Sequence, residues 1–303
     1  MPSADADEMA RDFTQLVDDL AYAKTFYPSS KVTRYINSQA SRIYLSIYKN
    51  RKEESSRLLT FWKYDLPLTI YRHHRTVLFV FLFFLLFFSI AFFVSMKDDT
   101  VPGILLGPGY IHATQENIDK GNPFGIYEHG SSFWMWIGIM INNIWVSMRM
   151  FLYGLFLGIP TLYHLGFEAS RIGVFDQFMA SKGLGLDFWL VVFVHGTLEI
   201  TAIIISAAAG VILGKSVLFP GTAKRLQSFK RGAKDGIKII VGLIPVLALA
   251  AFFEGFITRL YNNVPILTTI IFILSVLFVI WYFVIYPIML GRRMRLSLNE
   301  EEV

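Results

Sequence analysis

The sequence predicts an all-α polytopic membrane protein, in which a bundle of about six transmembrane helices follows an N-terminal cytoplasmic helical hairpin. Composition and the clustering of apolar residues lead to this fold class. Hydrophobic residues make up 54% of the 303 residues and charged residues only 17%, whereas soluble domains carry about 25% charged residues. The apolar residues form long runs, and the first, 76–96, is long enough to cross the roughly 30 Å of bilayer hydrocarbon.

Residues 1–75 are polar and predict the cytoplasmic hairpin. Residues 7–24 form a candidate helix with acidic residues early and Lys24 late, as the helix dipole favours. Tyr27 and Pro28 end it, and apolar residues then recur at helical spacing in a second helix. The following segment carries Trp62 among basic residues, which is typical of an interfacial helix. An amphipathic helix packed on the hairpin fits this segment equally well.

The charge pattern predicts the orientation of the spans. Basic residues precede the first run, and acidic residues prevail in the ordered loop 97–130 that follows it. By the positive-inside rule, the basic side is cytoplasmic and the loop is external. The further runs are 133–150, 151–175, 187–213, 236–260 and 264–290. The bundle 76–290 then has a cytoplasmic loop at 214–235 and a cytoplasmic tail at 291–303, so we expect both termini in the cytoplasm.

Two features of the bundle follow from residue type. Pro160 predicts a kink in the third run, and the second run, 133–150, fits either a full span or a re-entrant segment. Small residues four apart predict close helix contacts. These are Gly154 and Gly158, Ala169 and Gly173, and Gly210 and Gly214. The sixth run has no charge at membrane depth, so we expect it at the periphery.

Polar residues inside the apolar runs mark the candidate functional site. His195 and Glu199 lie four residues apart in one run, which places them on one helix face. A charge near the bilayer centre costs about 2.5–3.5 kcal/mol on insertion scales, so such groups need partners. At 1.5 Å per residue, the intramembrane polar residues of four spans fall in the middle and outer half of the bundle. They are Asn142, Asn143, His164, Glu168, Arg171, His195, Glu199 and Glu254.

Three interpretations of this polar cluster stay open. The first is structural pairing, with Glu168–Arg171 and His195–Glu199 satisfied inside the bundle. The second is a cavity that handles protons or a solute. The third is a metal site built from His195, Glu199 and Glu254, and possibly His164, because imidazole and carboxylate suit first-row metal ions. We assign no catalytic residue and expect no cofactor.

Composition excludes several classes of protein. The chain has no cysteine, so it has neither disulfides nor thiolate metal sites. Its net charge of +5 comes from basic residues that flank the apolar runs, where membrane topology explains them. Nucleic-acid motifs are missing from the sequence. The expected partners are therefore the lipid bilayer and other proteins.

Three short segments resemble signature runs of the stage II sporulation protein M family. They are INNI at 141–144, VHGTLEI at 194–200 and FEGFIT at 253–258, and the N-terminal segments around Asp19 and Arg34 are also similar to that family. The resemblance implies a membrane scaffold for two cell-wall remodelling enzymes, a lytic transglycosylase and an amidase, that act outside the membrane. His164 and Glu168 depart from the family, which has a more neutral stretch there.

The leading functional hypothesis is therefore a non-enzymatic inner-membrane scaffold linked to the cell envelope, with loop 97–130 as the docking surface. The alternative is a transporter or lipid-handling protein whose polar cluster lines an outward-facing cavity. The third hypothesis is an intramembrane metalloprotein.

Overall fold

The computed structural model describes residues 3–49, 57–125, 131–261 and 264–301. Every regular element in these ranges is helical, and none of them is a strand. The chain divides into two compact units, 1–58 and 59–303.

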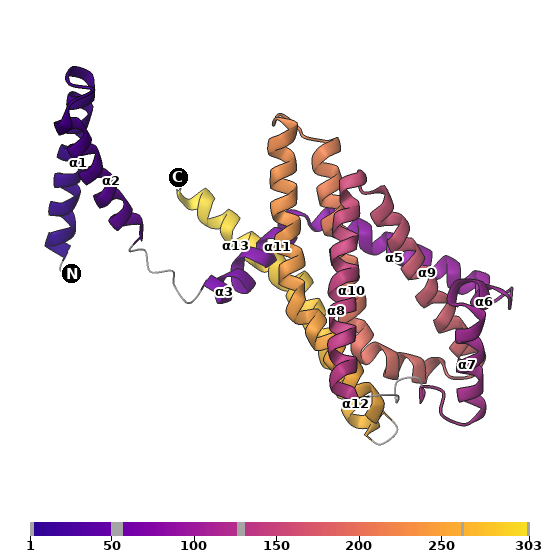
Figure 1. Cartoon of the computed structure of the whole chain (residues 1–303). Helices are drawn as coiled ribbons and strands as arrows, with labels where there is room; N and C mark the ends of the chain where they lie inside the picture. Colours follow the sequence, from indigo (N-terminus) through magenta and orange to yellow (C-terminus); the bar gives the residue numbers. More distant parts are fainter. Residues whose placement is uncertain (1–2, 50–56, 126–130, 262–263, 302–303) are drawn as a thin grey trace. The chain divides into compact units, whose positions relative to one another are not determined.

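The first unit contains α1 (Ser3–Phe26) and α2 (Lys31–Lys49), which pack against each other (Figure 1). Buried Thr33 joins them, because its hydroxyl lies 3.3 Å from the carbonyl of Ala23 and 2.6 Å from that of Tyr27. Ser30 accepts the backbone N–H of Thr33 at 3.0 Å and so caps the start of α2.

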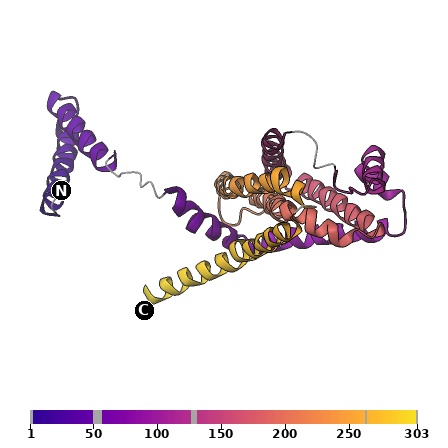
Figure 2. The same ribbon diagram turned by 90° about the horizontal axis from the view of Figure 1, so that it is seen from below.

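The remaining elements follow in chain order. They are α3 (Arg57–Thr60), η1 (Phe61–Asp65), α4 (Leu66–Arg72), α5 (His74–Ser95), α6 (Val101–Leu106), α7 (Pro108–Asp119), α8 (Ser132–Leu152), η3 (Tyr153–Phe156), α9 (Ile159–Ser181), α10 (Gly185–Leu218), α11 (Arg225–Phe252), η4 (Phe253–Ile257), η5 (Thr258–Leu260), α12 (Pro265–Val279), η6 (Ile280–Ile285) and α13 (Tyr286–Glu301). Figure 2 shows α12, η6 and α13 as one continuous helix.

Within the described residues, five helical stretches are long and apolar enough to cross a membrane. They are His74–Ser95, Ser132–Phe156, Gly185–Leu218, Arg225–Leu260 and Pro265–Met294. They correspond to the first, second, fourth, fifth and sixth predicted runs. The third run corresponds mainly to α9, which is not among the five. The count of six spans therefore stays a prediction.

The third predicted run is divided differently from our expectation. Helix α8 continues to Leu152, and the chain then breaks at Leu157 and Gly158, whose φ angles are 60° and 80°. Pro160 falls in the first turn of α9. The predicted kink at Pro160 is thus wrong, because a proline in the first turn has no helical N–H to lose and starts a helix rather than bending one.

Helix α10 is the centre of the second unit. Half of its most apolar window is buried, against 17% for α5 and for the α12 stretch. One core cluster joins α10 to α11 and α4, and a second joins α10 to α5 and α9. The low burial of α12 agrees with the peripheral place expected for the last run.

Glycines let the helix backbones around α10 touch. A Cβ atom added to Gly154 would lie 2.8 Å from the Cα atom of Gly210, and one added to Gly214 would lie 2.5 Å from the backbone nitrogen of Gly158. A Cβ atom on Gly173 would collide with the carbonyl oxygen of Phe88 on α5. The contacts predicted from small-residue spacing are confirmed at these positions.

The segment after α5 is folded. Asp98 accepts hydrogen bonds from the backbone N–H and the hydroxyl of Thr100, and these hydrogen bonds hold the pKa of Asp98 below its ordinary value. Helices α6 and α7 follow, and Phe124 is 2% exposed in a cluster with Phe178, Met179, Phe188 and Val191. Residues 126–130 of the predicted loop 97–130 lie outside the described residues.

Candidate functional site

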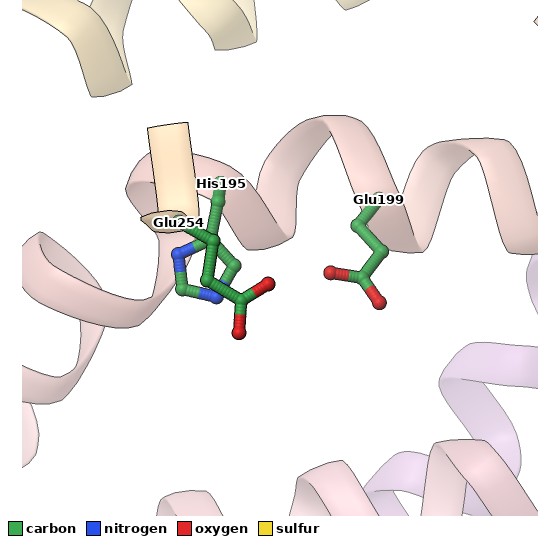
Figure 3. Close-up of side chains that lie close together, drawn as sticks. All are labelled: His195, Glu199 and Glu254. Atoms are coloured by element: carbon green, nitrogen blue, oxygen red, sulfur yellow. The ribbon is translucent and has the colours of Figure 1, made fainter. Parts of the chain in front are cut away.

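Three of the predicted residues come together between α10 and η4. His195 and Glu199 stand one turn apart on α10, and Glu254 comes from η4. One ligand atom from each, a ring nitrogen or a carboxylate oxygen, lies within 4.8 Å of the other two. Figure 3 shows the two carboxylates pointing toward each other, with the imidazole beside Glu254. His195 is buried, and both glutamates are half-buried.

A local change in helix type places Glu254. Helix α11 passes into the π-helical turn Phe253–Ile257 and then into the 3-10 turn Thr258–Leu260. A π turn adds a residue to the repeat and so turns the following side chains to a different direction. The hydroxyl of Thr258 lies 3.2 Å from the carbonyl of Phe253, across this turn. Such turns are common at functional sites.

Thr258 also sets the protonation of the His195 ring. Its hydroxyl donates to the carbonyl of Phe253, so it accepts from His195 Nδ1, which lies 3.0 Å away. Nδ1 therefore carries a proton, and when the imidazole is neutral this is the Nδ1–H tautomer, assigned from this hydrogen-bond network. Nε2 carries the lone pair, so it is the nitrogen suited to accept a proton or to bind a metal ion.

Helices α8 and α9 bring further polar groups to Glu199. The side-chain amide of Asn143 on α8 approaches its carboxylate, and the charge of Glu168 on α9 acts on it. Asn143 is only 4% exposed, and its Nδ2 atom makes no well-formed hydrogen bond within the described part of the chain. The Asn143 Oδ1 atom accepts a long hydrogen bond, 3.4 Å, from Asn142, which is itself exposed.

Glu168 and Arg171 form the predicted pair, with 3.6 Å between Arg171 Nη1 and Glu168 Oε2. Tyr110 on α7 lies close enough to Arg171 and Glu254 to feel both charges. Burial raises the pKa of the Tyr110 hydroxyl, Arg171 lowers it, and Glu254 raises it. The ring of Tyr110 packs edge-on against Phe175 at 5.5 Å. The α6–α7 segment thus packs against α9 within electrostatic range of the polar cluster.

His164 lies apart from this group. Its ring stacks on Tyr153 of η3 with centroids 4.6 Å apart. The sequence also gave no signal for Tyr110, because aromatic residues in loops are common, or for the π turn. Thr258 is not among the predicted site residues, although the pattern Glu254-x-x-x-Thr258 places both within about one helical turn.

The donor set limits the chemistry of the site. A neutral imidazole and two carboxylates can bind a divalent cation or exchange protons. The charge pair Glu168–Arg171 and the amide of Asn143 can hold these groups in place. A functional role for this polar cluster stays a prediction. Entry of a transported solute into it also stays a prediction.

A family model described as Stage II sporulation protein M matches residues 78–259, which is more than half of the chain. A model described as a domain of unknown function (DUF8413) matches residues 1–49. No curated protein matches the chain, and no solved structure does. The first match contains Asn143, His195, Glu199 and Glu254.

Proposed function

Because the chain belongs to the stage II sporulation protein M family, we propose that this multi-pass membrane protein is a non-enzymatic scaffold of the bacterial inner membrane. It holds cell-wall remodelling enzymes at the outer face of the bilayer. Its docking surface is the helical pair α6–α7, and both termini lie in the cytoplasm.

The observation that carries this proposal is the anchoring of α6–α7. Buried Pro102, Thr114 and Phe124 hold the segment against the bundle. The opposite side is exposed at Ile104, which is 75% exposed, and at His112 and Glu116. A surface that is rigid on one side and open on the other binds a partner without a large ordering cost. The nearby polar cluster then serves to hold the bundle under this surface.

Single cysteines test the proposed topology. The chain has no cysteine, so Glu116→Cys and Gln227→Cys each create one labelling site at an exposed position. In intact cells, a membrane-impermeant maleimide should label Glu116→Cys, and it should label Gln227→Cys only after the cells are permeabilised. Labelling of both variants, or of Gln227→Cys alone, in intact cells would contradict the orientation.

Site-specific crosslinking tests the docking surface. A photo-reactive amino acid at Ile104 or His112 should give crosslinks to envelope proteins with peptidoglycan-cleaving domains. The control is the same amino acid in place of Leu226, which lies at the start of α11 and is 63% exposed. The scaffold role fails if Ile104 and His112 crosslink no more strongly than Leu226, or if they crosslink only to lipid.

A surface variant completes the test. Glu116→Arg reverses one charge on α7 while leaving the buried anchors in place, so the protein should fold and lose its partner. The Leu226→Arg variant, which adds an arginine at an exposed position on α11, is the control. Retained capture of the partner by Glu116→Arg together with Ile104→Asp would show that α6–α7 is not the docking surface.

A further inference from the structure

We propose that His195, Glu199 and Glu254 bind a divalent transition-metal ion, for which zinc is the first probe. The inference does not depend on the scaffold role. The ligand atoms of the three residues lie within 4.8 Å of one another. With zinc bonds of about 2.0–2.2 Å, tetrahedral ligand atoms lie about 3.3 Å apart. The side chains must therefore close by at most about 1.5 Å, which glutamate side-chain rotation permits.

The orientation of His195 is the one that metal ligands adopt. Metal-binding histidines donate one ring N–H to a second group and bind through the other nitrogen. Here Nδ1 donates to the hydroxyl of Thr258, and that hydroxyl donates in turn to the carbonyl of Phe253. Nε2 is thereby prepared as the metal-binding nitrogen.

Charge also favours a dication. Two carboxylates in a membrane bundle repel each other, and the charge of Glu199 acts on Glu254. A dication bound by both carboxylates and a neutral imidazole gives a group with no net charge, which removes the cost of burying the two anions. Glu168 does not disturb this balance, because Arg171 pairs with it.

An independent observation points to the same place. Asn143 is 4% exposed and its Nδ2 atom, which faces Glu199, makes no well-formed hydrogen bond within the described residues. An unsatisfied buried donor is costly. Three protein ligands leave a fourth position on tetrahedral zinc for a water molecule. A water held there gives the Asn143 amide an acceptor.

The ion would join α10 to the π turn of η4. A metal bound between two helices ties them at fixed distance, and it binds the folded state only. The predicted role is thus to fix the break in α11 against the central helix, beside Tyr110 and α7.

Metal content tests the proposal. The full-length protein, with any affinity tag removed, is stripped with a chelator, titrated with zinc and measured by mass spectrometry. Wild type should bind zinc stoichiometrically, and His195→Gln and Glu254→Gln should lose it. The matched control His164→Gln removes the same chemical group as His195→Gln, at a ring that stacks on Tyr153 away from the cluster, and should bind like wild type. Thr258→Val should weaken zinc binding about 10–100-fold.

The proposal is overturned if stripped wild type takes up none of zinc, iron(II), manganese and cobalt(II), in which case the carboxylates share a proton instead. It is also overturned if Glu254→Gln binds as wild type does, or if His164→Gln loses zinc as His195→Gln does. If a site variant fails to fold, the visible absorption of cobalt-loaded wild type tests whether the site binds metal. Bands of nitrogen- and oxygen-bound cobalt that zinc abolishes support the site, and their absence refutes it.

Discussion

Substituting Gly210 by alanine tests whether backbone contact holds α10 in the bundle. The added Cβ atom would lie 2.8 Å from the hydroxyl oxygen of Thr161 and closer still to the carbonyl oxygen of Met150. That carbonyl also accepts the Thr161 hydroxyl at 2.9 Å, so neither atom can move without breaking a buried hydrogen bond. Overpacking costs about 1–3 kcal/mol when side chains must give way, and here backbone must move.

The same substitution at Gly196 is the control on the same helix. Its Cβ atom would meet only side-chain carbons, at 3.7 Å from Ile200 and 3.9 Å from Val192. Alanine is favoured over glycine in a helix interior by about 1 kcal/mol. We therefore expect Gly196→Ala to be neutral or stabilising by up to about 1 kcal/mol, and Gly210→Ala to be destabilising by about 1–3 kcal/mol.

Thermal unfolding in one detergent, followed by tryptophan fluorescence, measures the difference between the two variants. The expected gap is about 1–4 kcal/mol, obtained by adding the two opposite effects. A gap of zero, or a Gly210→Ala variant as stable as wild type, would refute close contact between α8 and α10.

Three further substitutions have predicted outcomes. Asp235→Ala should cost about 1–3 kcal/mol, measured by thermal unfolding, because Asp235 is buried and lies 2.9 Å from His73 Nε2. Trp62→Phe should cost about 1 kcal/mol in the same measurement, because it removes the 3.1 Å hydrogen bond from Trp62 Nε1 to the carbonyl of Gly242. Thr33→Val should cost about 1 kcal/mol in the first unit, seen as faster hydrogen exchange in α1 and α2.

Each has a control that removes a polar contact less buried than the one tested. Lys238→Ala removes one side of a 4.0 Å surface pair with Asp65 and should change stability by less than about 0.5 kcal/mol. Tyr286→Phe removes an exposed hydrogen bond to the carbonyl of Lys63 and should also cost little. Ser38→Ala removes an exposed hydrogen bond to the carbonyl of Tyr35 in α2 and should also cost little. Equal effects in a test variant and its control would show that burial of these contacts does not matter.

The spans were predictable from hydrophobicity, and their ends were not. The run 76–96 became His74–Ser95, but the run 187–213 became Gly185–Leu218. Hydropathy measures the apolar stretch, whereas a helix continues into polar sequence wherever packing supports it. Gly232 of α11 packs against Ser216, close to the end of α10, so both helices extend into the predicted loop 214–235.

The site was predictable in part, because helical spacing alone places His195 beside Glu199 and depth alone brings Glu254 to the same level. Depth along the helix did not predict the position of His164. We expected the third helix to begin at 151, whereas α9 begins at Ile159. Four residues correspond to about 6 Å along a helix, so Glu168 reaches Glu199 while His164 lies one turn farther away, against Tyr153. Tyr110 required tertiary structure, because no periodicity connects a loop helix to the bundle.

The length of α10 has a consequence for the lipid around it. Its 34 residues span about 51 Å, whereas bilayer hydrocarbon is about 30 Å thick. A helix that long tilts or extends into the headgroups, and the choice depends on bilayer thickness. Since Gly210 and Gly214 lock α10 to the ends of α8 and η3, α10 cannot tilt alone. We therefore expect a change in acyl-chain length to reorient these helices together rather than α10 alone.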